Sequence, residues 1–388
     1  MTRAVPTDVR LDPDGAVTRA LVAAVAAGEP GLQVSAYVDG RCVIDAAAGW
    51  AGPGRDAPLG TGHLFPVFSV TKGVVAAAVL RHAADGAVDL DRPVVAYWPR
   101  FGEGPGSAGK DSVTLRHVLT HSAGLPQMPK GTTAARMADW EWMADALCAE
   151  PLLWKPGEAA GYHAYTYGWL LGEPLRLALG LDQPPGAAIR RTVTEHFGQS
   201  DFWLGLPEEL GPRVVTLGWN GPPMSQDGLR GRALPGHIAP GQETFGRPEV
   251  RRSAHLGAGG IATASAVAGI YDVLAGSVHD GGRYGMVLGD GVRPHRRDTD
   301  RVLGAEVSRG LGFRVGDPCN ARQAFPFDAP SQTFGHPGAG GSVGWGDLAR
   351  RAGFAVNRVG LTARGYADPV VRNVVNALLR AVTGVVGF

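Results

Sequence analysis

Lysine is scarce in this chain of 388 residues. Only four of the 37 basic side chains are lysine, at positions 72, 110, 130 and 155, and the rest are arginine. A guanidinium stays protonated in proteins, whereas an ammonium can lose its proton. Each lysine is therefore a candidate for proton-transfer chemistry that arginine cannot perform.

The chain also has little net charge and no long apolar run. Its 37 basic and 36 acidic side chains give a formal charge of +1, and the basic residues form no cluster. A protein that binds nucleic acid or an anionic membrane uses such a cluster against phosphate groups, so we expect neither partner. No apolar stretch is long enough to span a membrane, and residues 1–15 lack the apolar run of a secretory signal.

Cysteine is equally scarce. Cys42, Cys148 and Cys319 lie far apart, are odd in number and have no metal-ligand spacing. This pattern argues against a disulfide scaffold and is typical of a reduced protein of the cytoplasm, which is the location we expect.

Apolar residues make up 44% of the chain and predict a sizeable core. Residues 15–28 have the apolar spacing of an amphipathic helix, and two β-type runs flank Asp39-Gly40, which is a hairpin signal. Residues 70–84 have apolar side chains at helical spacing and no Gly or Pro after Gly73. We therefore expect a buried helix that begins just behind Ser69.

Strand signals return near the C-terminus. We expect strands within residues 310–316 and 350–360, followed by a helix over residues 368–383. Because strand signals lie at both ends of the chain, the terminal thirds are expected to share one sheet.

The middle of the chain, residues 95–250, is richer in Pro, Trp and loop signals, with helical patterns such as 114–121 and 137–149. We therefore expect an α+β fold with two parts. One is a sheet domain built from residues 1–94 and 251–388, and the other is the inserted, mainly helical stretch of residues 95–250, which we expect to wall the cleft of any active site.

The strongest chemical signal is the pair Ser69 and Lys72 at the start of the expected helix. Side chains at i and i+3 share one face of a helix, so the lysine amine lies within reach of the serine hydroxyl. An ordinary lysine, with a pKa of about 10.4, is almost fully protonated at pH 7. Burial among apolar residues lowers that pKa and makes the amine a usable base. The alternative is a serine that caps the helix beside a surface lysine.

The same spacing occurs a second time, at Ser107 and Lys110. Gly and Pro in the segment GEGPGSAGKD prevent a helix there, so we interpret this copy as a solvated loop. The segment also imitates a phosphate-binding loop, but it has Asp where the Mg-ligating Ser or Thr belongs.

The chain contains, in this order, the segments FSVTKGVVAAAVLRHAADGAVDLDRPV, TLRHVLTHSAGLP, WKPGEAAGYHAYTYGWLLGE and FGHPGAGGSVGWGD. These segments and their order resemble the serine hydrolases related to class C β-lactamases, a group that includes the family VIII carboxylesterases, D-aminopeptidases and secondary-metabolite acyltransferases. The resemblance spans roughly residues 15–365. It implies a β-lactamase/transpeptidase-like fold, with a central antiparallel sheet flanked by N- and C-terminal helices and an inserted, mostly helical domain.

The resemblance also implies roles for individual residues. Ser69 is expected to be the nucleophile that forms an acyl-enzyme, with Lys72 as its base partner and Tyr162 as a phenol that shuttles protons. A lysine ammonium close to Tyr162 favours the phenolate form. His163 is the next residue in the chain, and it is expected to be either a buried structural histidine or a substrate contact.

The third motif of the family falls on His336 and Gly338, on a strand that lines the cleft. The glycines here let the backbone approach a substrate closely. The family's oxyanion hole uses the amide of the nucleophile and one amide on this strand. The resemblance therefore makes the N–H groups of Ser69, Gly340 and Gly341 the expected donors.

Two positions depart from the β-lactamase pattern. The second motif of these enzymes is Tyr-x-Asn, but residue 164 is Ala, and the third motif has His336 in place of the lysine that helps to hold the drug's carboxylate. We therefore do not expect efficient β-lactam hydrolysis. The Tyr-His pair and the His-x-Gly strand are more similar to the esterase and acyltransferase branch.

Two other patterns are weaker. Ser342 lies in a Gly-x-Ser-x-Gly pattern, but Trp345 and the residues after it lead toward a strand, so we do not expect the nucleophile elbow of an α/β-hydrolase. His117 and His121 have i, i+4 spacing, but HVLTH lacks the Glu of a zinc protease. We expect His121 to organise the end of its helix.

We expect a two-step acyl transfer in which Ser69 attacks a small ester, thioester or activated amide and water then releases the acyl group, as in a carboxylesterase. The alternative is an acyltransferase of a secondary-metabolite pathway, such as antibiotic biosynthesis, that passes the acyl group to an amine or alcohol. A true β-lactamase and a catalytically silent penicillin-binding-like protein are less favoured.

The expected partners are a small acyl donor and, for transfer, its acceptor. No cofactor is implied, because the chemistry uses side chains and backbone donors. The sequence does not indicate the oligomeric state. A group of tryptophans is expected either to line an apolar pocket or to belong to the core, namely Trp140, Trp142, Trp154, Trp169 and Trp219.

Overall fold

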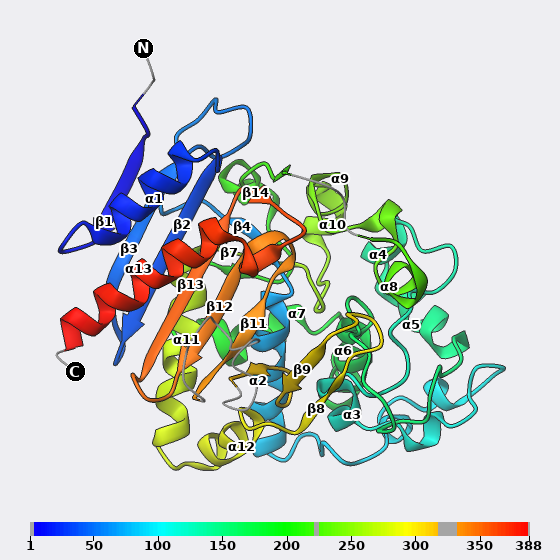
Figure 1. The fold of residues 1–388 in the computed structure, drawn as a ribbon. Helices are drawn as coiled ribbons and strands as arrows, with labels where there is room; N and C mark the ends of the chain where they lie inside the picture. The colour runs from blue at the N-terminus through cyan, green and yellow to red at the C-terminus, as the bar shows by residue number, and fades with distance from the viewer. Residues whose placement is uncertain (1–3, 221–224, 317–331, 387–388) are drawn as a thin grey trace.

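The computed structural model describes residues 4–220, 225–316 and 332–386, and its largest element is a nine-stranded antiparallel sheet (Figure 1). The order of strands across the sheet is β1 (Thr7–Leu11), β3 (Arg41–Gly49), β2 (Gly31–Val38), β13 (Ala352–Arg358), β12 (Val343–Asp347), β11 (Thr333–Pro337), β10 (Arg314–Val315), β9 (Glu306–Arg309) and β8 (Arg296–Thr299).

Strands from the two ends of the chain meet where β2 pairs with β13. Val34 lies opposite Val356 in this pairing, and both strands are buried along almost their whole length. The prediction that the two terminal thirds share one antiparallel sheet is therefore confirmed.

Helices cover both faces of the sheet (Figure 1). Helices α1 (Ala16–Ala26) and α13 (Pro369–Val386) pack together on one face, where their apolar sides form a core with β2, β3, β12 and β13. On the opposite face lie α11 (Ala264–His279), α2 (Val70–Ala84) and α12 (Arg283–Gly291). The expected terminal helices and the hairpin turn at Asp39-Gly40, with φ of 48° and 78°, are confirmed.

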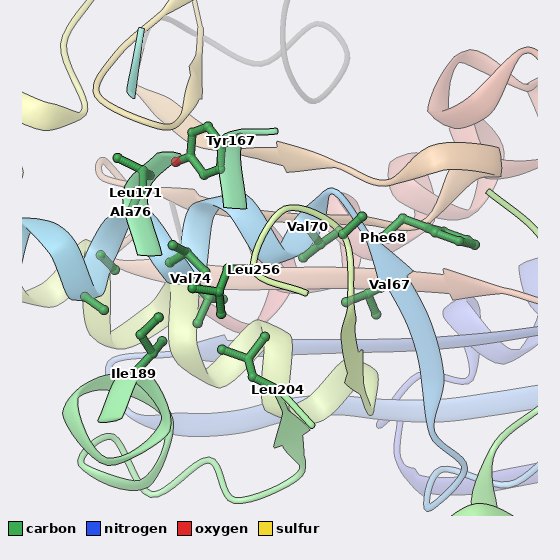
Figure 2. Packing of buried hydrophobic residues seen from close by; sticks show 14 of the residues in the cluster. Val67, Phe68, Val70, Val74, Ala76, Tyr167, Leu171, Ile189, Leu204 and Leu256 are labelled. Carbon is green, nitrogen blue, oxygen red and sulfur yellow. The ribbon is translucent and has the colours of Figure 1, made fainter. Parts of the chain in front are cut away.

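Helix α2 is apolar on all sides and is buried almost along its whole length, as expected for a helix inside a core. Figure 2 shows Val70, Val74 and Ala76 of this helix among side chains from other segments of the chain. Gly73 leaves no room for a side chain, because a Cβ there would lie 2.1 Å from the Tyr271 hydroxyl. The packing fixes α2, and with it Ser69, relative to the sheet.

The middle of the chain consists mainly of short helices and loops, with the short strands β5 and β6. Its helices are α3 (Leu115–Leu119), α4 (Ala134–Ala138), α5 (Trp140–Ala149), α6 (Tyr167–Ala178), α7 (Gly186–Ile189), α8 (Gly228–Ala233), α9 (Gln242–Phe245) and α10 (Pro248–Arg252). Two small sheets complete the fold, namely β4 (Phe65–Phe68) with β7 (Gly260–Ala262) and β5 (Phe202–Trp203), and β14 (Gly360–Leu361) with β6 (Gly218–Trp219).

The core around α2 continues from the sheet into these helices. The domain boundaries expected at residues 94/95 and 250/251 stay a prediction.

In the described ranges, no helix has both the length and the apolar character needed to cross a membrane. Cys42 and Cys148 are free thiols, and Cys319 lies outside the described residues.

Lys110 differs from the sequence-based interpretation. No α-helix forms at this second Ser-x-x-Lys, as expected, but the lysine is fully buried rather than solvated. Its Nζ donates hydrogen bonds to the carbonyl oxygens of Leu147 and Cys148, at 2.9 and 2.7 Å, above the ring of Phe101. Burial lowers the pKa of Lys110 to about 8. The solvated-loop interpretation is wrong for this side chain, because the loop turns it inward.

Candidate active site

Ser69 lies at the turn between strand β4 and helix α2, where it is the residue that precedes the helix. Phe68 just before it has a φ of 47°, which is unusual for a bulky residue. Full burial of Phe68 and its edge-on contact with Phe245, with ring centroids 5.1 Å apart, hold this conformation. The sharp turn exposes Ser69 to a cavity of about 210 Å³.

Lys72 is fully buried one turn into α2, directly beside the serine. Its Nζ lies 3.2 Å from Ser69 Oγ and 2.7 Å from each of the carbonyl oxygens of Ala164 and Gly257. Burial lowers the pKa of Lys72 well below its ordinary value, so the neutral amine is favoured.

The geometry fits a neutral amine, which has two N–H groups and one lone pair. The carbonyl oxygens of Ala164 and Gly257 accept the two N–H groups, and the lone pair then faces the Ser69 hydroxyl. Lys72 is therefore placed to accept the Ser69 proton. Ala164 occupies the position of Asn in the β-lactamase motif, and its backbone carbonyl binds the lysine.

Tyr162 lies over the same pair, with its ring centroid 4.8 Å from Lys72 Nζ and its side chain hydrogen-bonded to Ser69. Burial raises the pKa of Tyr162 to about 12, although this hydrogen bond and the charges of Arg314 and Arg309 act in the opposite direction. The phenolate expected from the sequence is therefore not the favoured form. Burial favours the neutral phenol instead.

A buried ion pair positions Tyr162. Asp300 accepts a hydrogen bond from the backbone N–H of Tyr162 at 3.1 Å and pairs with Arg309 at 2.6 Å. The two charged side chains are 0% and 3% exposed, so the pair is removed from water. The His121 ring also contacts the Tyr162 ring, with centroids 4.9 Å apart and planes tilted by 60°, and the His121 carbonyl accepts the N–H of Gly161 at 2.9 Å.

The substitution Asp300→Asn is expected to lower the free energy of unfolding by about 3 to 5 kcal/mol, because it leaves the Arg309 charge buried without its partner. Urea unfolding measures this effect. The matched control is Asp39→Asn, which removes an exposed pair with Arg351 and is expected to cost less than about 1 kcal/mol. Equal losses in the two variants would contradict a structural role for the pair behind Tyr162.

His163 points away from the cavity. Its Nε2 accepts a hydrogen bond from the Leu125 N–H at 3.0 Å, and its Nδ1 lies 2.7 Å from the Gly161 carbonyl oxygen. The ring is fully buried and does not line the cavity. The proposed role as a substrate contact is therefore corrected to a structural one, because both ring nitrogens already bind backbone.

His336 and Gly338 lie at the end of β11, on the wall of the cavity. The His336 ring stacks on Tyr162 with centroids 6.0 Å apart, and its Nδ1 lies 2.8 Å from the carbonyl oxygen of Pro337. Burial lowers the pKa of His336 well below its ordinary value, so the ring is neutral. A Cβ at Gly338 would lie 2.4 Å from the Val67 carbonyl oxygen, which explains the glycine where β11 approaches β4.

Only some of the expected oxyanion donors lie at the cavity. Gly341 does not line the cavity, and its N–H is directed at the Gly338 carbonyl oxygen at 3.4 Å. Ser69, Ala339 and Gly340 do line the cavity, and within the described ranges no hydrogen bond engages their N–H groups. The geometry therefore favours Ala339 over Gly341 as a candidate donor beside Ser69 and Gly340.

The other candidate patterns lie outside this cavity. Ser342 is buried and precedes strand β12 rather than a helix, as expected, and His121 lies beyond the end of α3 with a φ of 58°. In the part of the chain that the structure describes, no cluster of His, Cys, Asp and Glu side chains is placed to hold a metal ion. The tryptophans do not line the Ser69 cavity: Trp140, Trp154 and Trp169 are buried in the core, and Trp219 lines a neighbouring cavity.

Sequence reasoning missed three groups at this site. The Gly257 carbonyl had no side-chain signal, and Asp300 lies far from Tyr162 in the sequence. Arg314 lies on β10 within a short stretch of β-type residues and faces the cavity. Nothing in its own segment indicated this position.

A serine beside a buried amine, on an antiparallel sheet with helices on both faces, defines a class of enzyme: this protein is a serine hydrolase. The chain belongs to the beta-lactamase family. The sequence pattern of this family, described as Beta-lactamase, matches residues 17–377.

Individual relatives agree with this family. The chain is 31% identical over 354 residues to the Esterase/beta-lactamase LipL of Mycobacterium tuberculosis, covering 84% of this chain and 76% of LipL. Among solved structures, a family VIII carboxylesterase has a TM-score of 0.84 at 26% identity, over 97% of this chain and all of the other. A penicillin-binding protein homologue from Caulobacter crescentus has a TM-score of 0.83 at 31% identity, over 98% of this chain and all of the other. The expected β-lactamase-like fold is confirmed.

Proposed function

We propose that the protein is a carboxylesterase that hydrolyses a small ester, thioester or activated amide through an acyl group on Ser69. The observation that carries this proposal is the placement of Lys72, whose two N–H groups bind carbonyl oxygens and whose lone pair faces the serine hydroxyl. The names of the relatives LipL, an esterase, and the family VIII carboxylesterase support the same chemistry.

In the first half of the reaction, Ser69 Oγ attacks the substrate carbonyl as its proton passes to Lys72 Nζ. The N–H group of Ser69 and those of the turn at Ala339 and Gly340 stabilise the negative charge that develops on the carbonyl oxygen. Collapse of this intermediate breaks the bond to the leaving group. The leaving group takes a proton from Tyr162, which is replaced by the proton held on Lys72, and the acyl-Ser69 ester remains.

In the second half, water takes the place of the leaving group. Neutral Lys72, through the Tyr162 hydroxyl, accepts a proton from the water as the water oxygen attacks the acyl carbonyl. The acid product leaves and the proton returns to Ser69. One ester and one water are consumed, and one acid and one alcohol are formed.

Turnover of p-nitrophenyl butyrate tests the proposed function, with nitrocefin as the comparison substrate. The proposal expects rapid ester hydrolysis and little cephalosporin hydrolysis, because His336 is a neutral side chain where β-lactamases have a lysine. The reverse preference would identify a β-lactamase. Failure to hydrolyse either compound, with no label on Ser69 from a fluorophosphonate, would identify a catalytically silent protein.

The pH dependence of turnover follows from the shifted pKa values of Lys72 and Tyr162. Lys72 must be neutral to accept the proton, so kcat/KM for the butyrate ester is expected to rise with pH through a pKa well below the ordinary lysine value of 10.5. Tyr162 must hold its proton, and its pKa of about 12 places the falling limb at high pH. A pH profile corrected for spontaneous hydrolysis measures both limbs. A rate that falls steadily as pH rises from neutrality would contradict these assignments.

Acyl transfer is the second candidate, with the enzyme serving a secondary-metabolite pathway. A further cavity of about 440 Å³, lined by Trp219 and Gln242, shares Pro240 with the Ser69 cavity and offers a place for an acceptor. An acyltransferase is expected to convert most of the butyryl group to a transfer product when an alcohol or amine is added. An esterase gives butyrate under the same conditions, and chromatography of the products separates the two.

We also propose that the protein works in the cytoplasm on small molecules. The free thiols of Cys42 and Cys148 support a reducing compartment. Fractionation of the source cells, followed by detection of the protein, tests this location.

A further inference from the structure

The cavity around Ser69 has an unusual charge composition. Arg230, Arg314 and Arg364 all line it, and its described lining contains no Asp or Glu. Acidic and basic residues are balanced over the whole chain, so this excess is local. Lys72 and His336 both have pKa values shifted toward the neutral form, and the arginines therefore supply the positive charge of the cavity.

Two of the arginines approach from the C-terminal side of the cavity. Arg314 is half-buried on β10, and its Nη1 donates a hydrogen bond to the Tyr366 hydroxyl at 2.8 Å. Arg364 lies two residues before Tyr366 and is exposed at the cavity mouth. The positive charge of Arg314 acts on Tyr162 and His336, which places it near the reacting groups.

Arg230 approaches from helix α8, in a different part of the chain. Its Nε atom is buried and has no hydrogen-bond partner among the described residues, which is a costly arrangement for a charged group. Within residues 4–220, 225–316 and 332–386, no ion pair engages Arg230, Arg314 or Arg364. By contrast, the fully buried Asp300 is paired with Arg309.

We propose that the substrate carries an ionised carboxylate, which these arginines hold while Ser69 attacks a carbonyl a few bonds away. This inference rests on the proposed esterase function and names its substrate class: half-esters of short dicarboxylic acids. Guanidinium groups bind carboxylates with paired, charge-assisted hydrogen bonds. The cavity of about 210 Å³ suits such a short molecule, since it holds about seven groups of the size of a water molecule.

A matched pair of substrates tests the proposal. The mono-4-nitrophenyl ester of glutaric acid carries a free carboxylate, whereas 4-nitrophenyl methyl glutarate has the same acyl chain without the charge. Water converts the first into glutarate and 4-nitrophenol. The wild-type enzyme is expected to have a kcat/KM at least about tenfold higher for the anionic ester, and added salt is expected to reduce this preference.

The variants Arg230→Gln and Arg364→Gln are each expected to lower the preference for the anionic ester by about tenfold. Arg314→Gln is less suited to the test, because this side chain also binds Tyr366 and acts on Tyr162. The matched control is Arg293→Gln, which changes an exposed arginine outside the cavity and is expected to keep the wild-type preference.

Inhibition of p-nitrophenyl butyrate turnover by glutarate and by inorganic phosphate distinguishes a carboxylate site from a phosphate site. Stronger inhibition by glutarate supports a carboxylate, and stronger inhibition by phosphate overturns it. Equal rates for the two glutarate esters, with no effect of Arg230→Gln or Arg364→Gln, would also overturn the proposal and leave the esterase function intact. If neither glutarate ester nor p-nitrophenyl butyrate is hydrolysed, the esterase function itself fails, and the substrate class fails with it.

Discussion

The variant Lys72→Met is expected to lose at least about 10³-fold in kcat for p-nitrophenyl butyrate. The substitution removes the lone pair that faces Ser69 and leaves the serine without a base, and general-base catalysis alone contributes about 10² to 10⁴. Lys72→Arg is expected to be as inactive, because a guanidinium cannot give up its proton at ordinary pH. Steady-state kinetics of the purified variants measure both losses.

Lys110 provides a matched control, because it is also fully buried in a Ser-x-x-Lys spacing and also donates to two carbonyl oxygens. Lys110→Met is expected to lower stability about as much as Lys72→Met, since both leave two carbonyl oxygens without a donor, but to keep most of the activity. If the two variants lose activity to the same extent, the loss reflects damage to the fold, and the role of Lys72 as base is wrong.

Ser69→Ala is expected to cause the largest loss of all, about 10⁴-fold or more in kcat, because it removes the atom that forms the acyl-enzyme. The rate of this variant that still exceeds the uncatalysed rate in water comes from the remaining N–H donors and from binding in the cavity. The same steady-state assay measures this loss.

Ser342→Ala is the control for Ser69→Ala. The Ser342 hydroxyl is buried, and in the part of the chain that the structure describes it has no hydrogen-bond partner, so its removal is expected to leave both activity and stability close to wild type. An inactive Ser342→Ala with an active Ser69→Ala would overturn the assignment of the nucleophile.

The elements that could be predicted from the sequence are those defined by local patterns. Helix α2 has the bounds expected from its apolar spacing, and the hairpin between β2 and β3 turns at Asp39-Gly40. The shared sheet followed from strand signals at both ends of the chain. Each of these features depends on neighbouring residues or on general rules of chain connection.

Long-range contacts could not be predicted in the same way. The Gly257 carbonyl binds Lys72 across 185 residues, and a backbone oxygen leaves no mark in the residue type. Asp300 reaches the backbone of Tyr162 across 138 residues. Such groups are brought together by packing of the whole fold, and only the structure identifies them.

The direction of a side chain was also beyond the sequence. His163 follows Tyr162 directly, yet it points to the Leu125 backbone instead of the cavity. Lys110 lies in a segment of Gly and Pro, yet it turns into the core. Burial decides the protonation of Tyr162 as well, since it raises a pKa that a nearby ammonium was expected to lower.

The measurement that tests the central claim most directly is the mass of the intact protein after rapid acid quench of a reaction with p-nitrophenyl butyrate, followed by peptide mapping. The account predicts a gain of one butyryl group on the peptide that contains Ser69, absent in Ser69→Ala and retained in Ser342→Ala. A butyryl group on any other residue, or one that persists in Ser69→Ala, would contradict it.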